Sequence, residues 1–436
     1  MNLLRAALMM IAFALPVQAA VDIQTVTSSG GIKAWLVEEP NIPFTALEIR
    51  FRGGTSLDAP GKRGAVNLMT ALIEEGAADL DAQGFAAARD GLAASFRFSS
   101  DEDGIAVSAR FLTENRDQAI DLLRKALIQP RFDADAVERV RGQVLAGLRS
   151  DEKDPETLAS RTFNALAFPD HPYGSKGDGT IASVTALTRD DIIAAHQGAL
   201  ARDRIYVAAS GDISAVELGA LLDTLLGDLP ATGAPLPGRA ELGLTAGVTV
   251  TDFPGPQSVI LFGHAGIKRD DPDFFAATIL NEVLGGGRFT ARLMTEVREK
   301  RGLTYGIGTY LVGYDHAELV LGQASVANAN VAQAIEVIRA EWAKIATEGI
   351  TEAELKATQT YLTGSYPLRF DGNGPIASIL VGMQVIGLDP DYPKTRNDKV
   401  MAVTPQDVKR VANRLYQPDA LRFVVVGQPD GVVAIE

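Results

Sequence analysis

The segment NRDQAIDLLR, at residues 115–124, is the first copy of an internal repeat. It recurs as NVAQAIEVIR at residues 330–339, an offset of 215 positions. A second pair, TRDDI at 188–192 and TPQDV at 404–408, has an offset of 216, and an apolar run follows each member. Two segments repeated at nearly the same offset indicate that the chain holds two copies of one fold.

The two copies are separated by PATGAPLPG at residues 230–238, a Pro/Gly-rich stretch without periodicity that is typical of a linker. We therefore expect an N-terminal domain at residues 21–229, a linker at 230–245 and a C-terminal domain at 246–436.

Each copy alternates short β-branched runs with longer amphipathic helices. Asp154 before Pro155 is a typical helix start, with an N-cap followed by proline at the first helical position. This pattern predicts an α+β fold, with helices on one face of a mostly antiparallel sheet. The runs expected to be strands include residues 46–51, 105–111, 258–262 and 318–322.

Residues 1–20 have the features of a secretory signal peptide. Arg5 precedes an apolar stretch, residues 6–15, and Val17-Gln18-Ala19 forms a small-residue cleavage site. We expect the mature chain to be exported and periplasmic. The alternative is an uncleaved anchor, but the apolar run is shorter than the roughly 20 residues of a spanning helix.

The composition restricts the chemistry. The chain has 436 residues, no cysteine and a formal charge of -14, which becomes -15 when Arg5 is removed with the signal. The absence of cysteine excludes disulfides, thiolate metal sites and a cysteine nucleophile. The acidic balance argues against nucleic acid and anionic membrane as partners.

A helix near the N-terminus has the frame of a metal site but not its ligands. In RGAVNLMTALIEEG, residues 63–76, positions 67 and 71 share one helix face and position 70 lies beside them. The segment resembles the zinc helix of the inverted-zincin peptidases, family M16 (pitrilysin and insulinase), in which His-x-x-Glu-His supplies two zinc ligands and a base. The resemblance places ligands at Asn67 and Ala71 and the base at Thr70, and none of these side chains can do that work.

The third ligand of the family is a glutamate about 75 residues beyond the second histidine, which corresponds here to Gly147. Apolar residues recur around it at helical spacing, so the helix is expected without its ligand. The four histidines are scattered, and none has a partner at i+3 or i+4. We therefore expect no metal in this chain. The histidines are His171, His196, His264 and His316.

The C-terminal copy carries GGGRFTARLMTEVREKRGLTYGIG at residues 285–308. Thr290 is placed to cap a helix that ends at Gly302, and Leu303, Tyr305, Ile307 and Thr309 alternate on a following strand. The stretch resembles the C-terminal motif of the family, in which an Arg and a Tyr reach towards the zinc site. These are Arg298 and Tyr305, which could both donate to a substrate carbonyl or oxyanion. The alternative is a surface ion pair for the arginine and an ordinary half-buried strand position for the tyrosine.

Gly285, Gly286 and Gly287 predict a helix-to-helix turn that needs positive φ. In two-subunit members of the family, such as the mitochondrial processing peptidases, a longer glycine-rich loop at this position belongs to the subunit without zinc and handles substrate. The resemblance implies a substrate-loop role for this shorter loop.

The resemblance implies two homologous domains closing like a clamshell around an unfolded peptide. It predicts a zinc-lacking subunit that pairs with a homologous chain bearing His-x-x-Glu-His, with zinc in that partner, and that donates Arg298 and Tyr305 to the partner's active site. Two alternatives remain: a scaffolding pseudo-peptidase, and a metallopeptidase with unconventional ligands such as Glu74, Glu75 or His171.

Overall fold

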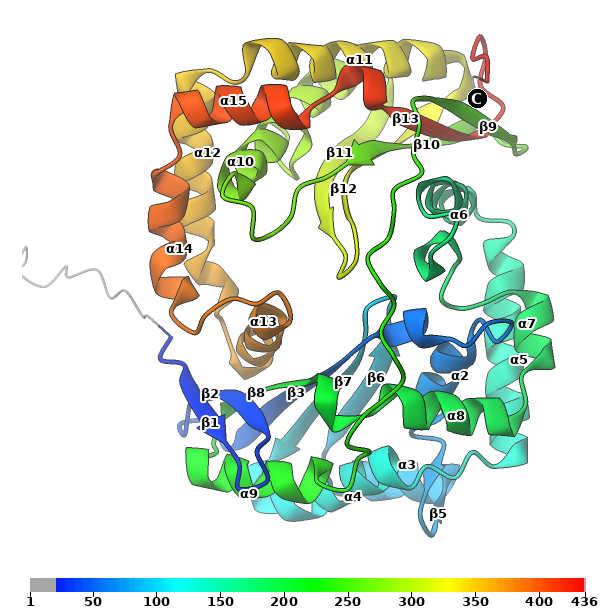
Figure 1. The fold of residues 1–436 in the computed structure, drawn as a ribbon, viewed down its shortest axis with the longest axis vertical. Coiled ribbons are helices and arrows are strands. Elements are labelled where there is room, and N and C mark those ends of the chain that lie inside the picture. The colour runs from blue at the N-terminus through cyan, green and yellow to red at the C-terminus, as the bar shows by residue number, and fades with distance from the viewer. Residues whose placement is uncertain (1–20, 435–436) are drawn as a thin grey trace, which may run out of the picture.

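The computed structural model describes residues 21–434 and contains two large β-sheets at opposite ends of the molecule (Figure 1). The first sheet has the order β1 (Gln24–Thr27), β2 (Lys33–Glu38), β8 (Ile205–Gly211), β3 (Phe44–Arg52), β7 (Gly104–Leu112), β6 (Ser95–Ser100). The second has the order β11 (Thr304–Gly313), β12 (Glu318–Ala327), β10 (Gln257–Ala265), β13 (Arg422–Gly427), β9 (Gly247–Asp252). A small hairpin joins β4 (Gly76–Ala77) to β5 (Leu80–Asp81).

Neighbouring strands are antiparallel except for β2 with β8 and β9 with β13, which are parallel. The predicted α+β class is therefore confirmed.

Helices follow the strands in both halves. The first half contains α2 (Ala65–Leu72), α3 (Ala82–Gly91), α4 (Arg116–Ile128), α5 (Ala134–Asp151), α6 (Pro155–Ala167), α7 (Ile181–Ala186), α8 (Arg189–Ala199) and α9 (Ala215–Leu226). The second contains α10 (Phe274–Gly285), α11 (Val331–Glu348), α12 (Glu352–Ser365), α13 (Asn373–Val385), α14 (Tyr392–Met401) and α15 (Pro405–Leu415). Short 3₁₀ turns are η1 (Gly54–Leu57), η2 (Thr113–Asn115), η3 (Pro172–Gly174), η4 (Arg202–Arg204), η6 (Asn328–Asn330), η7 (Pro367–Arg369) and η8 (Pro418–Ala420), and η5 (Met294–Glu299) is a π-helix.

The repeated sequences form equivalent elements. Thr188 and Thr404 each close a capping box, at the start of α8 and of α15. Each of these helices leads to an inner strand of its sheet, β8 or β13. The repeat read from the sequence is thus a repeat of structure.

The two halves exchange one helix each, which the sequence did not predict. Helix α6 of the first half packs on the second sheet, where Phe163 is buried among strand residues of β10, β12 and β13. Helix α13 of the second half packs on the first sheet, where Leu380 and Met383 contact Trp35 and Ala208. The expectation that helices cover only one face of each sheet is therefore wrong, because each second face receives a helix from the other half (Figure 1).

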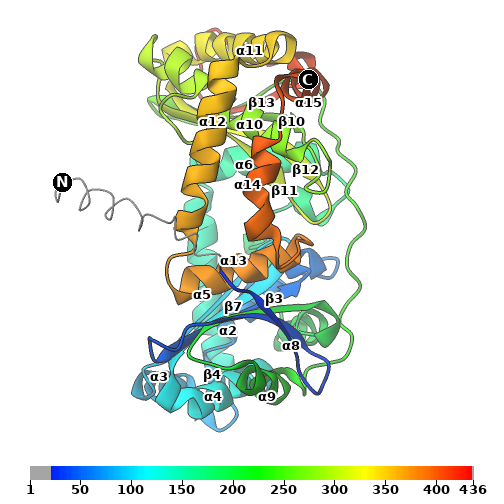
Figure 2. The ribbon, with the colours of Figure 1, turned by 90° about the vertical axis from the view of Figure 1, so that its left-hand side faces the viewer.

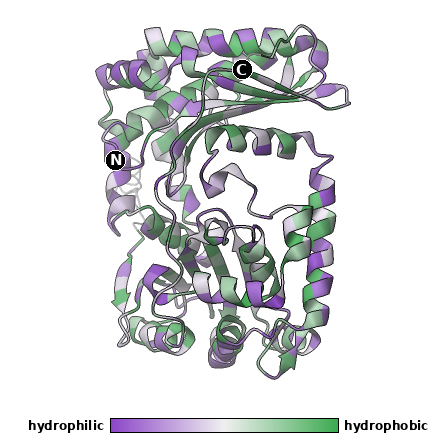
Figure 3. Cartoon of the chain, turned by 45° about the vertical axis from the view of Figure 1, so that its right-hand side comes forward, coloured by the Kyte–Doolittle hydropathy of each residue, from purple (hydrophilic) through white to green (hydrophobic). Residues whose placement is uncertain are grey.

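Each half has its own apolar core between its sheet and its own helices. Strands of both sheets are largely hydrophobic, whereas the outer helices alternate hydrophilic and hydrophobic positions (Figure 3). This alternation is the amphipathic pattern on which the helix predictions depended.

The segment between α9 and β9 runs along one side of the molecule (Figure 2). Its backbone donates hydrogen bonds from Ala234 to the Gly198 carbonyl and from Ala240 to the His316 carbonyl, at 2.8 and 2.9 Å. It is therefore held to both halves. The expected signal, residues 1–20, lies outside the described residues. Among residues 21–434, no helix has the length and apolarity needed to cross a membrane.

Candidate functional site

The helix that carries the vacant ligand positions is α2. Gly64 adopts φ of 97° just before it, and the buried Asp58 carboxylate accepts hydrogen bonds from the backbone amides of Gly64 and Val66, both at 2.8 Å. A carboxylate at this end also complements the helix dipole. The helix thus begins at a defined residue, although its metal ligands are missing.

The residues at the family's zinc positions do not fit zinc. Asn67 is half-buried and Ala71 exposed on α2, and Gly147 is exposed on α5, which packs against α2. Thr70 is buried, and its hydroxyl donates to the Val66 carbonyl at 2.8 Å. An amide, a methyl group and a bare backbone offer no imidazole or carboxylate, so the set cannot hold zinc in the usual way.

The unconventional ligands are engaged elsewhere. Glu74 pairs with Arg89 at 3.0 Å, and the Glu75 carboxylate accepts hydrogen bonds from Nη1 and Nη2 of Arg139. Nε2 of His171 lies 3.2 Å from the Gly238 carbonyl oxygen, to which it donates. No group of three potential ligands among residues 21–434 includes any of these three side chains.

Arg298 lies in the π-helix η5, which replaces the predicted α-helix. Thr290 is in the preceding turn and does not cap it. π-helical turns are rare in proteins, and those that occur often lie at functional sites. The guanidinium of Arg298 stacks on the ring of Phe289, with 4.9 Å from Cζ to the ring centroid. The alternative, a surface ion pair, is not found, since no carboxylate of residues 21–434 pairs with this arginine.

The other basic side chains of the same segment are all paired. Arg288 contacts Glu282, Arg292 contacts Glu354, and Lys300 and Arg301 both contact Glu296. Arg298 alone in this segment keeps its hydrogen-bond donors available, since an aromatic face attracts the cation but uses none of its directed N–H groups.

Tyr305 is turned outward by a β-bulge. Thr304 pairs with Val326 and Ile307 with Ala324, so Tyr305 and Gly306 together face Ser325. The hydroxyl of Thr304 holds the bulge, since it donates to the Ser325 carbonyl at 2.7 Å and accepts from the Gly306 amide at 3.2 Å.

The predicted alternation fails at this bulge. Leu303, Ile307 and Thr309 are buried as expected, whereas Tyr305 is 84% exposed. Bulges re-aim side chains at sheet edges, and β11 is an edge strand. Arg298 and Tyr305 therefore flank one tight turn, and neither side chain has a hydrogen-bond partner within the described chain.

None of the three glycines at the end of α10 has positive φ, which corrects the expected turn conformation, and two of them, Gly285 and Gly286, are needed for close approach. A Cβ on Gly285 would lie 2.8 Å from Cγ2 of Thr309, and one on Gly286 would lie 2.7 Å from Cα of Glu282. With Gly306 and Tyr310 the three glycines line a pocket of about 380 Å³ beside the bulge. The loop and the tyrosine strand thus form one surface.

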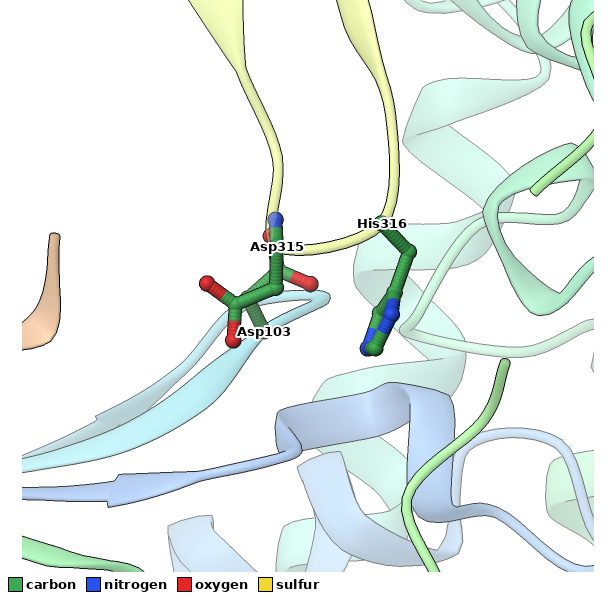
Figure 4. A group of neighbouring side chains, drawn as sticks. All are labelled: Asp103, Asp315 and His316. Atoms are coloured by element: carbon green, nitrogen blue, oxygen red, sulfur yellow. The ribbon is translucent and has the colours of Figure 1, made fainter. Parts of the chain in front are cut away.

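A second cluster joins the halves, and no sequence motif predicted it. Asp103, in the turn between β6 and β7, meets Asp315 and His316 at the tip of the β11–β12 hairpin (Figure 4). The Tyr173 hydroxyl donates to one oxygen of Asp103, and the Asp315 amide donates to the other at 3.0 Å. The oxygen of Tyr173 in turn accepts from the His316 amide at 3.1 Å. We call these four residues the latch.

Three residues of the latch, Asp103, Asp315 and His316, are the one group of three potential metal ligands within 4.8 Å of one another in the described part of the chain. Both carboxylates already have partners within the protein, because Asp103 accepts two hydrogen bonds and Asp315 forms an ion pair with Arg52. Burial raises the pKa of Asp103 to about 6, against the effect of its hydrogen bonds. We therefore interpret the latch as a hydrogen-bonded contact between the halves.

Two family models match the chain. Residues 33–179 match "Insulinase (Peptidase family M16)", and residues 186–362 match "Peptidase M16 inactive domain". The chain belongs to peptidase family M16. At the zinc positions of the family it carries Asn67, Ala71 and Gly147 in place of the ligands.

Among its M16 relatives, a crystal structure described as a peptidase M16 inactive domain from Pseudomonas fluorescens is 29% identical and has a TM-score of 0.87, covering 95% of this chain and 100% of that chain. A curated relative, the "Non-peptidase homolog YmxG" of Helicobacter pylori, is 24% identical over 88% of this chain and 89% of its own length. The "Probable mitochondrial-processing peptidase subunit beta" of Schizosaccharomyces pombe is 23% identical over 72% of this chain and 71% of its own.

The structure does not join the vacated zinc helix to the Arg/Tyr motif. No hydrogen bond or ion pair among residues 21–434 links residues 63–76 with residues 285–308. Arg298 and Tyr305 therefore form no direct bond to the helix that carries the vacated zinc positions of their own chain.

Proposed function

We propose that this chain is the zinc-lacking subunit of an M16-type zinc endopeptidase. In this proposal it acts in the periplasm on unfolded peptides and donates Arg298 and Tyr305 to the active site of a homologous subunit that carries His-x-x-Glu-His and the zinc.

The proposal rests on one observation, that the side chains of Arg298 and Tyr305 are both free to bind another molecule. In a segment where every other cation is ion-paired, Arg298 keeps its donors free, and a bulge held by Thr304 presents Tyr305 to solvent. A guanidinium fork and a phenol can both donate to a carbonyl oxygen or to the oxyanion that forms when water attacks it. Such donors contribute to catalysis only when a reacting group is brought to them.

The adjoining surface suits an extended peptide. The glycine-lined pocket offers backbone groups without side chains in front of them, and β11 presents a free sheet edge beside it. Extended peptides bind sheet edges through main-chain hydrogen bonds. The similarity to a processing-peptidase subunit also favours a role within a multisubunit peptidase.

The test combines the purified mature chain with a His-x-x-Glu-His homologue from the same genome. We expect chelator-sensitive cleavage of an unfolded peptide only by the mixture, and a loss of roughly 100-fold or more in kcat with Arg298→Ala or Tyr305→Phe. Arg301→Ala, which removes a paired arginine of the same segment, is the matched control and should retain activity. Cleavage by this chain alone, or full activity of both variants, would overturn the proposal.

A scaffolding role is the second candidate, and the relative described as a non-peptidase homologue favours it. It predicts a stable complex with the homologous chain in which Arg298→Ala and Tyr305→Phe change neither assembly nor cleavage. The same mixture therefore distinguishes the two functions. Export is tested separately, by fractionating cells and sequencing the mature N-terminus.

A further inference from the structure

The first sheet presents a polar face on the side opposite its core. On β7, Ile105, Val107 and Ala109 point into the core, so the intervening Ala106, Ser108 and Arg110 point to the other face. Register then places Arg97 opposite Ser108, and Ser95 opposite Arg110, on that same face. Helix α13 covers the β2, β8 and β3 part of the face and meets the Arg110 side chain of β7 only at its first turn, so most of the β6–β7 part is open.

Two arginines of this open part are unpaired. Arg97 and Arg110 are both exposed, and neither has an ion-pair or hydrogen-bond partner within residues 21–434. Other arginines on the face are neutralised, since Arg50 pairs with Asp101 and Arg52 with Asp315. The open face therefore carries two arginines that form no ion pair within residues 21–434, in a chain whose net charge is -14.

One carboxylate on this face, that of Glu48, compensates the two arginines only in part: it interacts with both of their charges, but it is a single group, and burial raises its pKa. Glu48 lies opposite Ser108 on the other side from Arg97, and it accepts the Ser108 hydroxyl at 2.6 Å. Arg110 reaches instead to the start of α13, where a Cβ on Gly374 would lie 3.0 Å from its Cζ. That end of a helix is itself positive, so the local field favours an anion.

From this charge pattern we infer that the β6–β7 face selects acidic segments of unfolded polypeptide, with Arg97 and Arg110 as the residues that determine specificity. The inference rests on the proposed peptide-handling function and names its substrate class. Arg97 and Arg110 are diagonal neighbours on two adjacent strands, and such diagonal positions lie about 7–8 Å apart. Side chains at i and i+2 of an extended peptide are separated by roughly 6.7 Å, so two carboxylates at that spacing can each meet one guanidinium.

The test uses the mature chain alone and two labelled ten-residue peptides that differ only in carrying Glu or Gln at positions i and i+2. Binding is measured by fluorescence anisotropy at low and high salt. We expect the Glu peptide to bind at least about 10-fold more tightly at low salt and the difference to shrink at high salt, because the charges are exposed. The net charge of the protein predicts the opposite sign, so the ranking of the two peptides is itself decisive.

The double variant Arg97→Gln/Arg110→Gln should remove the preference for the Glu peptide. Arg149→Gln/Arg202→Gln removes two other exposed, unpaired arginines with the same change in net charge, and it should keep the preference. Equal binding of both peptides, tighter binding of the Gln peptide, or an unchanged preference in the first variant would overturn the inference. So would failure of both peptides to bind. None of these results bears on whether the two-chain mixture cleaves, so failure here is distinct from failure of the proposed function.

Discussion

Rebuilding the vacated zinc site tests the reasoning on α2 and α5 directly. The variant Asn67→His/Ala71→His/Gly147→Glu places two imidazoles and one carboxylate at the family's ligand positions. If the three positions converge on one point, they form the His₂Glu set that binds catalytic zinc. We expect this variant to bind one zinc ion and the parent chain to bind none.

The structural cost should be small. A Cβ on Gly147 would meet no atom within 4 Å, so Gly→Glu gains about 0.6 kcal/mol of helix propensity. Ala→His at the exposed position 71 loses a similar amount, about 0.6 kcal/mol. Without metal the variant should therefore unfold at nearly the temperature of the parent.

Zinc at 100 times its Kd would stabilise the variant by about 2.7 kcal/mol. For a unit the size of one half, that corresponds to a rise in Tm of roughly 5–10 °C. The assays are metal content after dialysis and thermal unfolding with and without zinc. Peptidase activity should stay absent, because the base position is held by the buried Thr70.

The matched control moves the carboxylate to Gly142, which is also exposed on α5 with no atom within 4 Å of a Cβ. Five residues separate the two glycines, so the control ligand points about 140° away around the helix. A folded triple variant that binds no more zinc than this control would refute the convergence of the three positions.

Three further predictions concern stability, measured by urea unfolding. Tyr173→Phe should lower the free energy of unfolding by about 1–3 kcal/mol, because the buried carboxylate of Asp103 loses a donor. Asp103→Asn should flatten the pH dependence of the free energy of unfolding. The pKa of Asp103 in the folded protein is about 6, above its ordinary value of 3.8. The stability that protonated Asp103 contributes is therefore fully present below pH 3.8 and is lost as the pH rises through 6. Gly285→Ala should cost about 1–3 kcal/mol through the clash with Thr309, whereas Gly147→Ala should gain up to about 1 kcal/mol.

Each of these predictions has a contrary outcome. An unchanged stability in Tyr173→Phe would remove the latch as a contact that holds the halves. An identical slope between pH 4 and pH 6 in Asp103→Asn would assign the titration to another group. Similar effects of alanine at Gly285 and Gly147 would show that the close approach to Thr309 is not what requires a glycine.

Features that depend on short-range patterns could be predicted from the order of residues alone. Helical spacing, an Asp cap and strand alternation involve residues within about four positions, so α5 and the Asp154 start of α6 followed from local rules. The absence of zinc ligands at Asn67, Ala71 and Gly147 is likewise a statement about residue identity alone.

Features that depend on residues far apart in the chain became visible only in the folded molecule. The outward turn of Tyr305 comes from the register against β12, and the freedom of Arg298 comes from where the carboxylates lie in space. The latch joins Asp103 to residues more than 200 positions later, and α6 and α13 exchange sheets because the apolar face of each helix matches the other half's sheet. Such contacts depend on the folded arrangement of both halves, and no local periodicity records them.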